Sequence, residues 1–335
     1  MKRILITGAS GFIGGYLVDE ALRRGYEVWA GVRSSSSLRG LQGKGVKLID
    51  LQYADSQALT AQLREIASTV GPWHYVIHNA GLTKTLKVSD FDKVNHQYTA
   101  TLTEALAAVG CKPEKFVLMS SLSSYGPVRE HSDEPISESD PQRPDSRYGR
   151  SKQMAEQVVR SQKHFPYVIL RPTGVYGPGE KDYLVEIKSV MSGFDFKAGM
   201  RPQRLTFIYV RDLVAVALTA LEKEEANGRA FFVADGDVHT DSGFAKMIKD
   251  VVGKRFLISV RIPLCISYLA CIFSELAGRI THKAPTLNTD KYRIIRQRNW
   301  VCDVVPLREI LGFTPEYDLK KGLEETVKQL QNGEK

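Results

Sequence analysis

A glycine-rich turn follows the first apolar run of the chain. RILIT at residues 3–7 leads into TGASGFIG, which places Gly8, Gly11 and Gly14 three residues apart, and a helical pattern begins at residue 12. Glycine permits positive φ, close approach of the backbone to a pyrophosphate, and tight packing of the next helix on the strand. The amides at the start of such a helix bind phosphate groups. The order of strand, glycine turn and helix therefore predicts a dinucleotide site.

Short apolar runs and helical patterns then alternate through the first half of the chain. The strand-like runs are residues 3–7, 26–32, 46–50, 73–78, 115–120 and 167–172, and the helical patterns are 12–24, 55–69, 90–109 and 148–164. This alternation predicts an α/β fold, a Rossmann-type doubly wound parallel sheet with helices on both faces. The run RAFFVAD at 229–235 is expected to return to the same sheet.

The length of 335 residues exceeds the usual size of a single core. We expect a dinucleotide-binding domain at residues 1–172, to which 206–236 return. A smaller, mainly helical substrate-binding domain would comprise 173–205 and 237–335, and it would close over the carboxyl edge of the sheet, where ligands bind. The polar, proline-rich stretch 128–146 is expected to be an exposed loop beside the site.

Composition narrows the class of protein. Hydrophobic residues make up 43% and charged residues 25%, as in soluble globular proteins. The formal charge of +8 favours anionic ligands, but the basic residues are scattered and no nucleic-acid-binding motif occurs, so no nucleic-acid partner is predicted. Cys111, Cys265, Cys271 and Cys302 form no CxxC pair, which favours a reducing, cytoplasmic compartment, and no metal site is predicted. MKRILITG at the start resembles a strand more than a signal peptide.

The most apolar run is IPLCISYLACIF at residues 262–273. Twelve residues are too few for a spanning helix, so no transmembrane segment is predicted. Apolar residues recur at spacings of three and four at Ile262, Ile266, Leu269, Phe273, Leu276 and Ile280. This pattern predicts an amphipathic helix packed on one side, and peripheral membrane contact of 262–280 is the alternative.

The end of the second strand bears on the choice of dinucleotide. Val32, Arg33 and Ser34 stand where an NAD site usually places an acid, and no acid occurs between Glu27 and Asp50. The planar guanidinium of Arg33 suits a 2′-phosphate, to which a serine hydroxyl adds a donor. The sequence therefore favours NADP over NAD. Asp50, at the end of the third strand, is expected near the adenine amino group.

The stretch YGRSK sets Tyr148 and Lys152 four residues apart. Residues at this spacing share one face of a helix. A neighbouring cation favours the phenolate and lowers a tyrosine pKa that is otherwise about 10. Tyr148 is therefore a candidate general acid/base.

Five motifs in order carry a family resemblance. TGASGFIG, HNAG at 78–81, SSLSSYG at 120–126, YGRSK and RPTGVYGP at 171–178 together resemble the extended short-chain dehydrogenase/reductase family, and LGFTPEYDLKKGLEETV at 311–327 is similar to its C-terminal helix. The resemblance implies that Tyr148 exchanges a proton with the substrate oxygen. It also implies that Ser121 hydrogen-bonds this oxygen and that Lys152 holds the nicotinamide ribose and lowers the pKa of Tyr148. The neighbouring Ser120 and Ser123 could be mistaken for Ser121.

We expect the cofactor to contact the glycine turn, the ends of the strands and the Tyr-Lys pair. The expected residues are Thr7, Gly8, Ser10, Gly11, Phe12, Ile13, Gly14, Arg33, Ser34, Asp50, Leu51, Asn79, Ala80, Gly81, Asn95, Tyr148, Lys152, Arg171, Pro172, Gly174 and Val175. Of these, Asn95 is expected to have a structural or water-holding role.

Departures from the motifs separate the branches of the family. Sugar-nucleotide dehydratases carry an acidic pair after the serine, where this chain has Leu122 and Ser123. Sugar-nucleotide epimerases often hold the nucleoside diphosphate with an asparagine after the RP of the sixth strand and with an Arg-Asp-Phe triplet before a later strand. This chain has Thr173-Gly174 and Leu205-Thr206-Phe207 at these places. The chain is closest in motifs to the dihydroflavonol reductase and 3β-hydroxysteroid dehydrogenase branch.

This branch implies an NADP(H)-preferring oxidoreductase that interconverts a secondary alcohol and a ketone on a small, apolar, steroid- or flavonoid-like substrate. An NAD-dependent nucleotide-sugar epimerase is the alternative, and a non-catalytic NADP sensor is disfavoured by the Tyr-Lys pair. The basic run 291–298, with Lys291, Arg293, Arg296 and Arg298, is expected to bind an anionic substrate or to form a solvated face. A homodimer is a further expectation from the resemblance.

Overall fold

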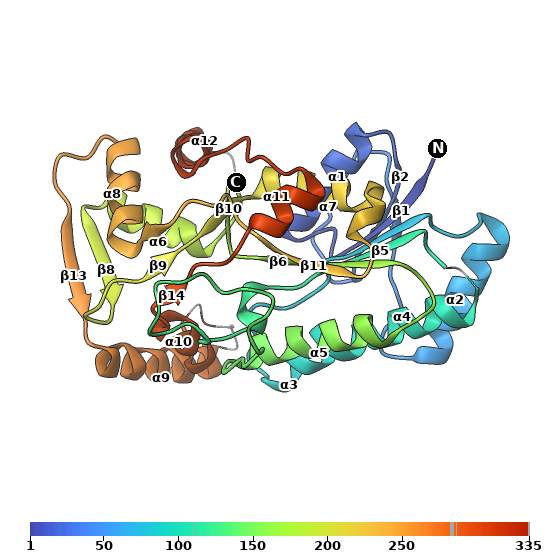
Figure 1. The fold of residues 1–335 in the computed structure, drawn as a ribbon, viewed down its shortest axis with the longest axis horizontal. Coiled ribbons are helices and arrows are strands. Elements are labelled where there is room, and N and C mark those ends of the chain that lie inside the picture. Colours follow the sequence, from blue (N-terminus) through green and yellow to red (C-terminus); the bar gives the residue numbers. More distant parts are fainter. Residues whose placement is uncertain (111, 282–284, 286, 334–335) are drawn as a thin grey trace.

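A seven-stranded parallel sheet forms the centre of the computed structural model, which describes residues 1–110, 112–281, 285 and 287–333 (Figure 1). The strands are β1 (Arg3–Thr7), β2 (Glu27–Gly31), β3 (Lys47–Ile49), β4 (Tyr75–His78), β5 (Lys115–Met119), β6 (Tyr167–Pro172) and β11 (Arg229–Val233). Their order is β11-β6-β5-β4-β1-β2-β3. The order reverses between β1 and β4, and ligands of such sheets bind outside the carboxyl ends at this point. The predicted Rossmann-type sheet is confirmed, including the return of 229–235.

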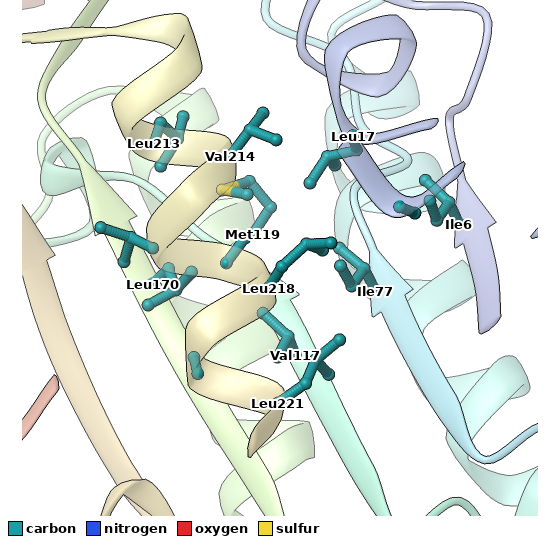
Figure 2. Close-up of a cluster of buried hydrophobic side chains, with 14 of the residues drawn as sticks. Ile6, Leu17, Ile77, Val117, Met119, Leu170, Leu213, Val214, Leu218 and Leu221 are labelled. Atoms are coloured by element: carbon teal, nitrogen blue, oxygen red, sulfur yellow. The ribbon is translucent and has the colours of Figure 1, made fainter. Parts of the chain in front are cut away.

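Helices cover both faces of the sheet. They are α1 (Phe12–Arg23), α7 (Val210–Glu222) and α11 (Val305–Leu311) on one face, and α2 (Ser56–Thr69), α4 (Tyr98–Ala108) and α5 (Arg147–Ser161) on the other. Alternate strand residues face opposite cores, so Ile6 packs with α1 and α7 while Leu5 packs with α2 and α4. In Figure 2, Leu213 and Leu218 of α7 lie against side chains of the central strands.

The predicted helix 90–109 is interrupted. It consists of α3 (Ser89–Phe91), a π-helical turn (Asp92–Gln97) and α4. Such turns inside helices are frequent at functional sites. This one carries Asn95, whose side chain is buried.

The C-terminal region has a core of its own. It is built from β7 (Gly174–Tyr176), α6 (Asp182–Met191), β10 (Phe207–Tyr209), α8 (Asp241–Val251) and α12 (Leu319–Gln331). The sequence did not indicate the small sheets of this region, in which β8 (Phe194–Ala198) pairs with β13 (Ile258–Ile262), and β9 (Arg204–Leu205) lies between β12 (His239–Thr240) and β14 (Asn299–Trp300). Short 3₁₀ turns occur at Leu122–Ser124 and Glu224–Ala226.

The loop 128–146 is less exposed than predicted. Ile136 is fully buried, its amide donates to the Val301 carbonyl, and the Asp303 amide donates to the Ile136 carbonyl. The loop is thus anchored to the C-terminal region. Cys265, Cys271 and Cys302 are unpaired thiols, and Cys111 lies outside the described residues.

The predicted packing of the apolar helix is wrong. The helix α9 (Leu264–Thr281) forms and lies beside α10 (Thr289–Arg296), but only Cys271 and Gly278 of α9 are buried. The apolar stripe that was expected to pack inward is exposed to solvent. Among the described residues, α9 is the one helix whose length and apolar composition would suffice to cross a membrane. The helix α9 is longer than the apolar run 262–273, because it continues through polar residues to Thr281.

Candidate active site

The glycine turn forms a cradle that side chains would fill. Gly8 has φ +65°, and a Cβ at this position would lie 2.9 Å from the backbone of Ala80. A Cβ on Gly14 would lie 2.1 Å from the Gly8 carbonyl oxygen, so only glycine allows α1 to pack this closely. Gly11 caps α1 without a side-chain hydrogen bond, and the first turn of α1 carries no acid. These residues fit a dinucleotide pyrophosphate.

The remaining predicted residues of the turn are exposed or half-buried. Ser10 is exposed, and Phe12 and Ile13 are half-buried at the start of α1. Side chains and backbone of this turn are therefore accessible from the carboxyl edge of the sheet.

A buried hydrogen-bond chain joins the ends of β1 and β4. Thr7 Oγ1 accepts from the Ala80 amide at 3.0 Å and lies 2.9 Å from His78 Nδ1. His78 Nε2 lies 3.0 Å from Thr99 Oγ1. Burial, with a smaller contribution from the charge of Lys152, lowers the pKa of His78 to about 3, so its ring is neutral. These hydrogen bonds hold the segment Asn79, Ala80, Gly81 beside the glycine turn.

Sequence reasoning missed His78 as a positioning residue. A histidine at the end of the apolar run WHYVIH was the available signal.

The segment after β2 presents Arg33 and Ser34 to solvent. The Ser34 amide donates to Asp50 Oδ2 at 3.1 Å, which brings the second and third strand ends together. Among the described residues, no acidic side chain forms an ion pair with the Arg33 guanidinium. Leu51 is buried in the core, so its side chain does not face this region.

The N-terminus of α5 fixes the backbone around Tyr148. Ser146 Oγ accepts from the Gly149 amide at 3.0 Å. The Asp290 carboxylate of α10 accepts from the amides of Arg147 at 2.6 Å and Tyr148 at 3.2 Å. The helix that carries the Tyr-Lys pair is therefore held by a residue far along the chain, which the sequence did not indicate.

Lys152 is buried one turn after Tyr148. Its Nζ donates to the Met119 carbonyl at 2.8 Å, at the end of β5. A Cβ on Gly81 would lie 3.1 Å from this Nζ, so glycine leaves space beside the ammonium. Burial lowers the pKa of Lys152 to about 8.

The predicted lowering of the Tyr148 pKa is wrong for this structure. Desolvation raises the pKa of Tyr148, and the nearby Ser121 hydroxyl opposes this. The Lys152 ammonium donates to the Met119 carbonyl. Ser121 itself lies at the start of the turn Leu122–Ser124, where its Oγ accepts from the Ser123 amide at 3.1 Å. This hydroxyl lies close to the Tyr148 phenol, whose pKa it lowers.

Asn95 ties the backbone near Gly81 to α5. Its Oδ1 accepts from the Leu82 amide at 2.7 Å, and its Nδ2 donates to the Leu82 carbonyl at 3.0 Å and to Ser151 Oγ at 2.9 Å. Every polar atom of the side chain is occupied by protein, which agrees with the structural role expected for it.

Arg171 does not reach the cofactor region as expected. Its buried guanidinium is 2.7 Å from Glu156 and 2.6 Å from Glu138. Pairing with Glu156 compensates the cost of burying both charges. Ser120 Oγ also donates to Glu156, at 2.5 Å, which distinguishes it from Ser121.

The residues after Arg171 follow the sheet edge. Pro172 is buried, and Gly174 and Val175 are half-buried in β7. A Cβ on Gly174 would lie 2.1 Å from the Tyr183 hydroxyl, so this glycine serves packing in the C-terminal region.

The basic run 291–298 is mostly engaged within the protein. Lys291 lies 3.2 Å from Asp182, and Arg296 lies 2.9 Å from Asp145. Arg298 donates to backbone carbonyls, including those of residues 198 and 201. Arg293 is exposed.

The fold and this site define an NAD(P)-dependent enzyme of the extended short-chain dehydrogenase/reductase type. The chain belongs to the NAD dependent epimerase/dehydratase family, whose model matches residues 4–234.

Relatives extend the match to the whole chain. The chain is 28% identical over 344 residues to uncharacterized protein y4nL of Sinorhizobium fredii, covering 97% of this chain and 94% of that protein. It is 25% identical to UDP-glucose 4-epimerase of Vibrio cholerae, with the same coverage. The crystal structure of UDP-glucose 4-epimerase from Thermotoga maritima has a TM-score of 0.78 at 23% identity, covering 99% of this chain and all of that one. This structural likeness concerns the fold.

Proposed function

We propose that the protein is an NADP(H)-preferring oxidoreductase that interconverts a secondary alcohol and a ketone on an apolar, steroid- or flavonoid-sized substrate. The observation that carries the proposal is that the Ser121 hydroxyl lies close to the Tyr148 phenol, with buried Lys152 one helical turn away. Two hydroxyls that converge on one oxygen stabilise the alkoxide character that develops at this oxygen.

Each residue then has one task. A bound nicotinamide cofactor supplies or accepts the hydride. In the direction of reduction, Tyr148 donates its proton to the substrate oxygen as the carbonyl becomes an alcohol, and Ser121 donates a hydrogen bond to the same oxygen. The raised pKa of Tyr148 keeps the phenol protonated and ready to donate at neutral pH. Lys152 of α5, whose ammonium reaches the carboxyl end of β5, orients the cofactor side of the site.

The preference for NADP rests on Arg33. Its exposed guanidinium lies beside Ser34, at the strand end where an acid would repel a 2′-phosphate. The carboxylate of Asp50 accepts a hydrogen bond from the Ser34 amide.

The apolar substrate class is supported by the engagement of three of the four bases of the run 291–298 within the protein, while Arg293 is exposed. Lys291, Arg296 and Arg298 are engaged by protein groups, so they offer little to a nucleoside diphosphate. The phenol ring of Tyr148 has an aromatic neighbour, Phe91, with 6.1 Å between the ring centroids.

The catalytic assignment is tested by Tyr148→Phe. We expect turnover of a ketone panel with NADPH to fall by about 10²–10⁴-fold, while the dissociation constant for NADPH changes little. Tyr167→Phe, at the opposite end of the sheet on β6, is the matched control and should keep full turnover. Unimpaired turnover in Tyr148→Phe would remove this residue from the mechanism.

The cofactor assignment is tested by calorimetric titration of nucleotide-free protein with NADPH and NADH. We expect wild type to bind NADPH more tightly, and Arg33→Ala to lose roughly 10- to 100-fold in NADPH affinity with little change for NADH. Arg39→Ala removes another exposed arginine of the same segment and should leave both affinities unchanged. Equal losses for both nucleotides in Arg33→Ala would exclude Arg33 from the site.

The second candidate is an NAD-dependent nucleotide-sugar epimerase. The full-length similarity to UDP-glucose 4-epimerase of Vibrio cholerae favours it. An epimerase returns its hydride to the substrate and shows no net redox change. Protein that is purified with NAD already bound, and that binds NADH more tightly than NADPH, would bring this candidate to the front.

A further inference from the structure

The strand pair β8–β13 has its apolar face on the outside. Phe194 pairs with Ile258, and Phe196 pairs with Val260, so the four side chains lie on one face of the pair. All four are exposed. Phe194 and Phe196 stack on each other with 6.1 Å between ring centroids.

On β8 the opposite face is charged and turned inward. Asp195 and Lys197 are 1% and 5% exposed, and they form an ion pair of 2.7 Å. Lys197 also lies 3.0 Å from Glu186 of α6. A solvent-facing strand pair usually alternates the other way, with polar residues outside. This reversal indicates a surface that is covered by a lipid bilayer or by another protein.

A second exposed apolar stripe follows on α9. Ile266, Leu269, Phe273, Leu276 and Ile280 recur every three or four residues and are all exposed. α9 begins two residues after β13 ends, and both elements lie at the same end of the molecule (Figure 1). We call the exposed apolar side chains of β8, β13 and α9, together with Phe256, the apolar face. Exposed apolar surfaces of this kind mark interaction sites.

The stretch of sequence that carries β13 and α9 is basic. The stretch 254–300 contains nine Lys and Arg against two Asp and Glu, which is +7 of the formal net charge of +8. Three of these bases, Arg261 among them, pair with acids of other elements. Lys254 and Arg255, next to Phe256, are exposed. Both acids of the stretch are engaged, since Glu275 accepts from Thr289 and Asp290 accepts from the first amides of α5.

We propose that the apolar face binds the surface of an anionic lipid bilayer, with α9 lying in the plane of the interface. Amphipathic helices bind such surfaces through buried apolar area together with the attraction of basic residues to anionic headgroups. A second copy of this chain fits less well, because a symmetric interface would bring two basic surfaces together. The proposal does not depend on the enzymatic activity proposed above.

The contacts of α9 favour this in-plane position over a spanning one. Cys271 and Gly278 are buried against the protein, and the Tyr268 ring lies 5.0 Å from that of Tyr292 on α10. Thr289 Oγ1 donates to Glu275 at 3.0 Å. A helix that crossed the bilayer would lose all of these contacts.

The same contacts connect the apolar face to the active site. α9 packs on α10, and Asp290 of α10 holds the amides at the start of the helix that carries Tyr148. A bilayer under α9 therefore lies on the side of the molecule where α5 begins. Should the proposed activity hold, an apolar substrate could pass from the bilayer to Tyr148 without crossing bulk water.

The experiment is co-sedimentation of the full chain with vesicles of phosphatidylcholine alone or with about 30% phosphatidylglycerol, at low and high salt. We expect binding to the anionic vesicles that weakens with salt, and little binding to neutral ones. Leu269→Glu should reduce vesicle affinity by tenfold or more. Val305→Glu is the matched control, because Val305 and Leu269 are both 52% exposed, and it should bind like wild type.

Other outcomes would overturn the proposal. Equal binding by wild type and Leu269→Glu would exclude α9 from the interface. Light scattering that shows a dimer dissolved by Leu269→Glu, together with no vesicle binding, would assign the face to a second copy. Turnover of a water-soluble ketone by Leu269→Glu separates the membrane proposal from the proposed activity. Loss of vesicle binding with unchanged turnover would show that the variant is folded and active and that α9 is needed only for the membrane.

Discussion

The buried ammonium of Lys152 makes stability depend on pH in a defined window. Its pKa is lowered to about 8 in the folded protein, from an ordinary 10.5, because burial penalises the charged form. Between these values the unfolded chain binds more protons than the folded one, so this group makes the folded state more stable as the pH rises. Below pH 8 Lys152 is protonated in both the folded and the unfolded state, and the cost of burying its charge destabilises the folded state in full. Integration from pH 7 to 9.5 gives a gain of about 2 kcal/mol.

The measurement is urea unfolding at pH 7 and 9.5 for wild type and Lys152→Met. Methionine keeps an unbranched side chain of similar length but does not titrate, so the variant should lack this gain of about 2 kcal/mol. Other titrating groups contribute equally to both proteins and cancel in the difference. Lys246→Met, at an exposed lysine of α8, should behave like wild type. If the difference between wild type and Lys152→Met were the same at both pH values, the burial argument for Lys152 would be refuted.

Two further predictions follow from backbone contacts. Gly14→Ala should destabilise the protein by about 1–3 kcal/mol or more and weaken dinucleotide binding, because its Cβ would lie 2.1 Å from the Gly8 oxygen. Its neighbour Gly15 faces open space, so Gly15→Ala should be neutral or stabilising by up to about 1 kcal/mol; equal losses of thermal stability in both variants would contradict this reading. Asp290→Ala removes the acceptor of two amides at the start of α5, so it should lower the free energy of unfolding by about 1–3 kcal/mol. It should also lower kcat more than it changes cofactor affinity. Asp290→Asn should partly restore the stability in denaturation assays and kcat in kinetic assays.

The elements of the central sheet were predictable because their signals are local. Each strand of the central sheet is a short apolar run, and each helix between them repeats its apolar residues at helical spacing. The glycine turn and the Tyr148-Lys152 pair were likewise identified from contiguous motifs. Strand ends and helix ends differ from the prediction by only a few residues.

The packing partners of polar and charged groups were not predictable in this way. Arg171 appeared to belong to the cofactor site, but Glu156, fifteen residues earlier in the chain, engages its guanidinium. Asp290 reaches the start of α5 across more than 140 residues. Such contacts depend on how separate elements are placed in space, and no local pattern encodes that placement.

The sequence by itself determined the class of the fold and the candidates for the reacting side chains, because periodicity and motif spacing act over a few residues. Only the tertiary structure decided the charge states and the surfaces. It showed that desolvation raises the pKa of Tyr148, and that β8 and α9 turn their apolar sides outward. Burial is a property of the whole packed chain, since the same amphipathic stripe is core or surface according to what lies against it.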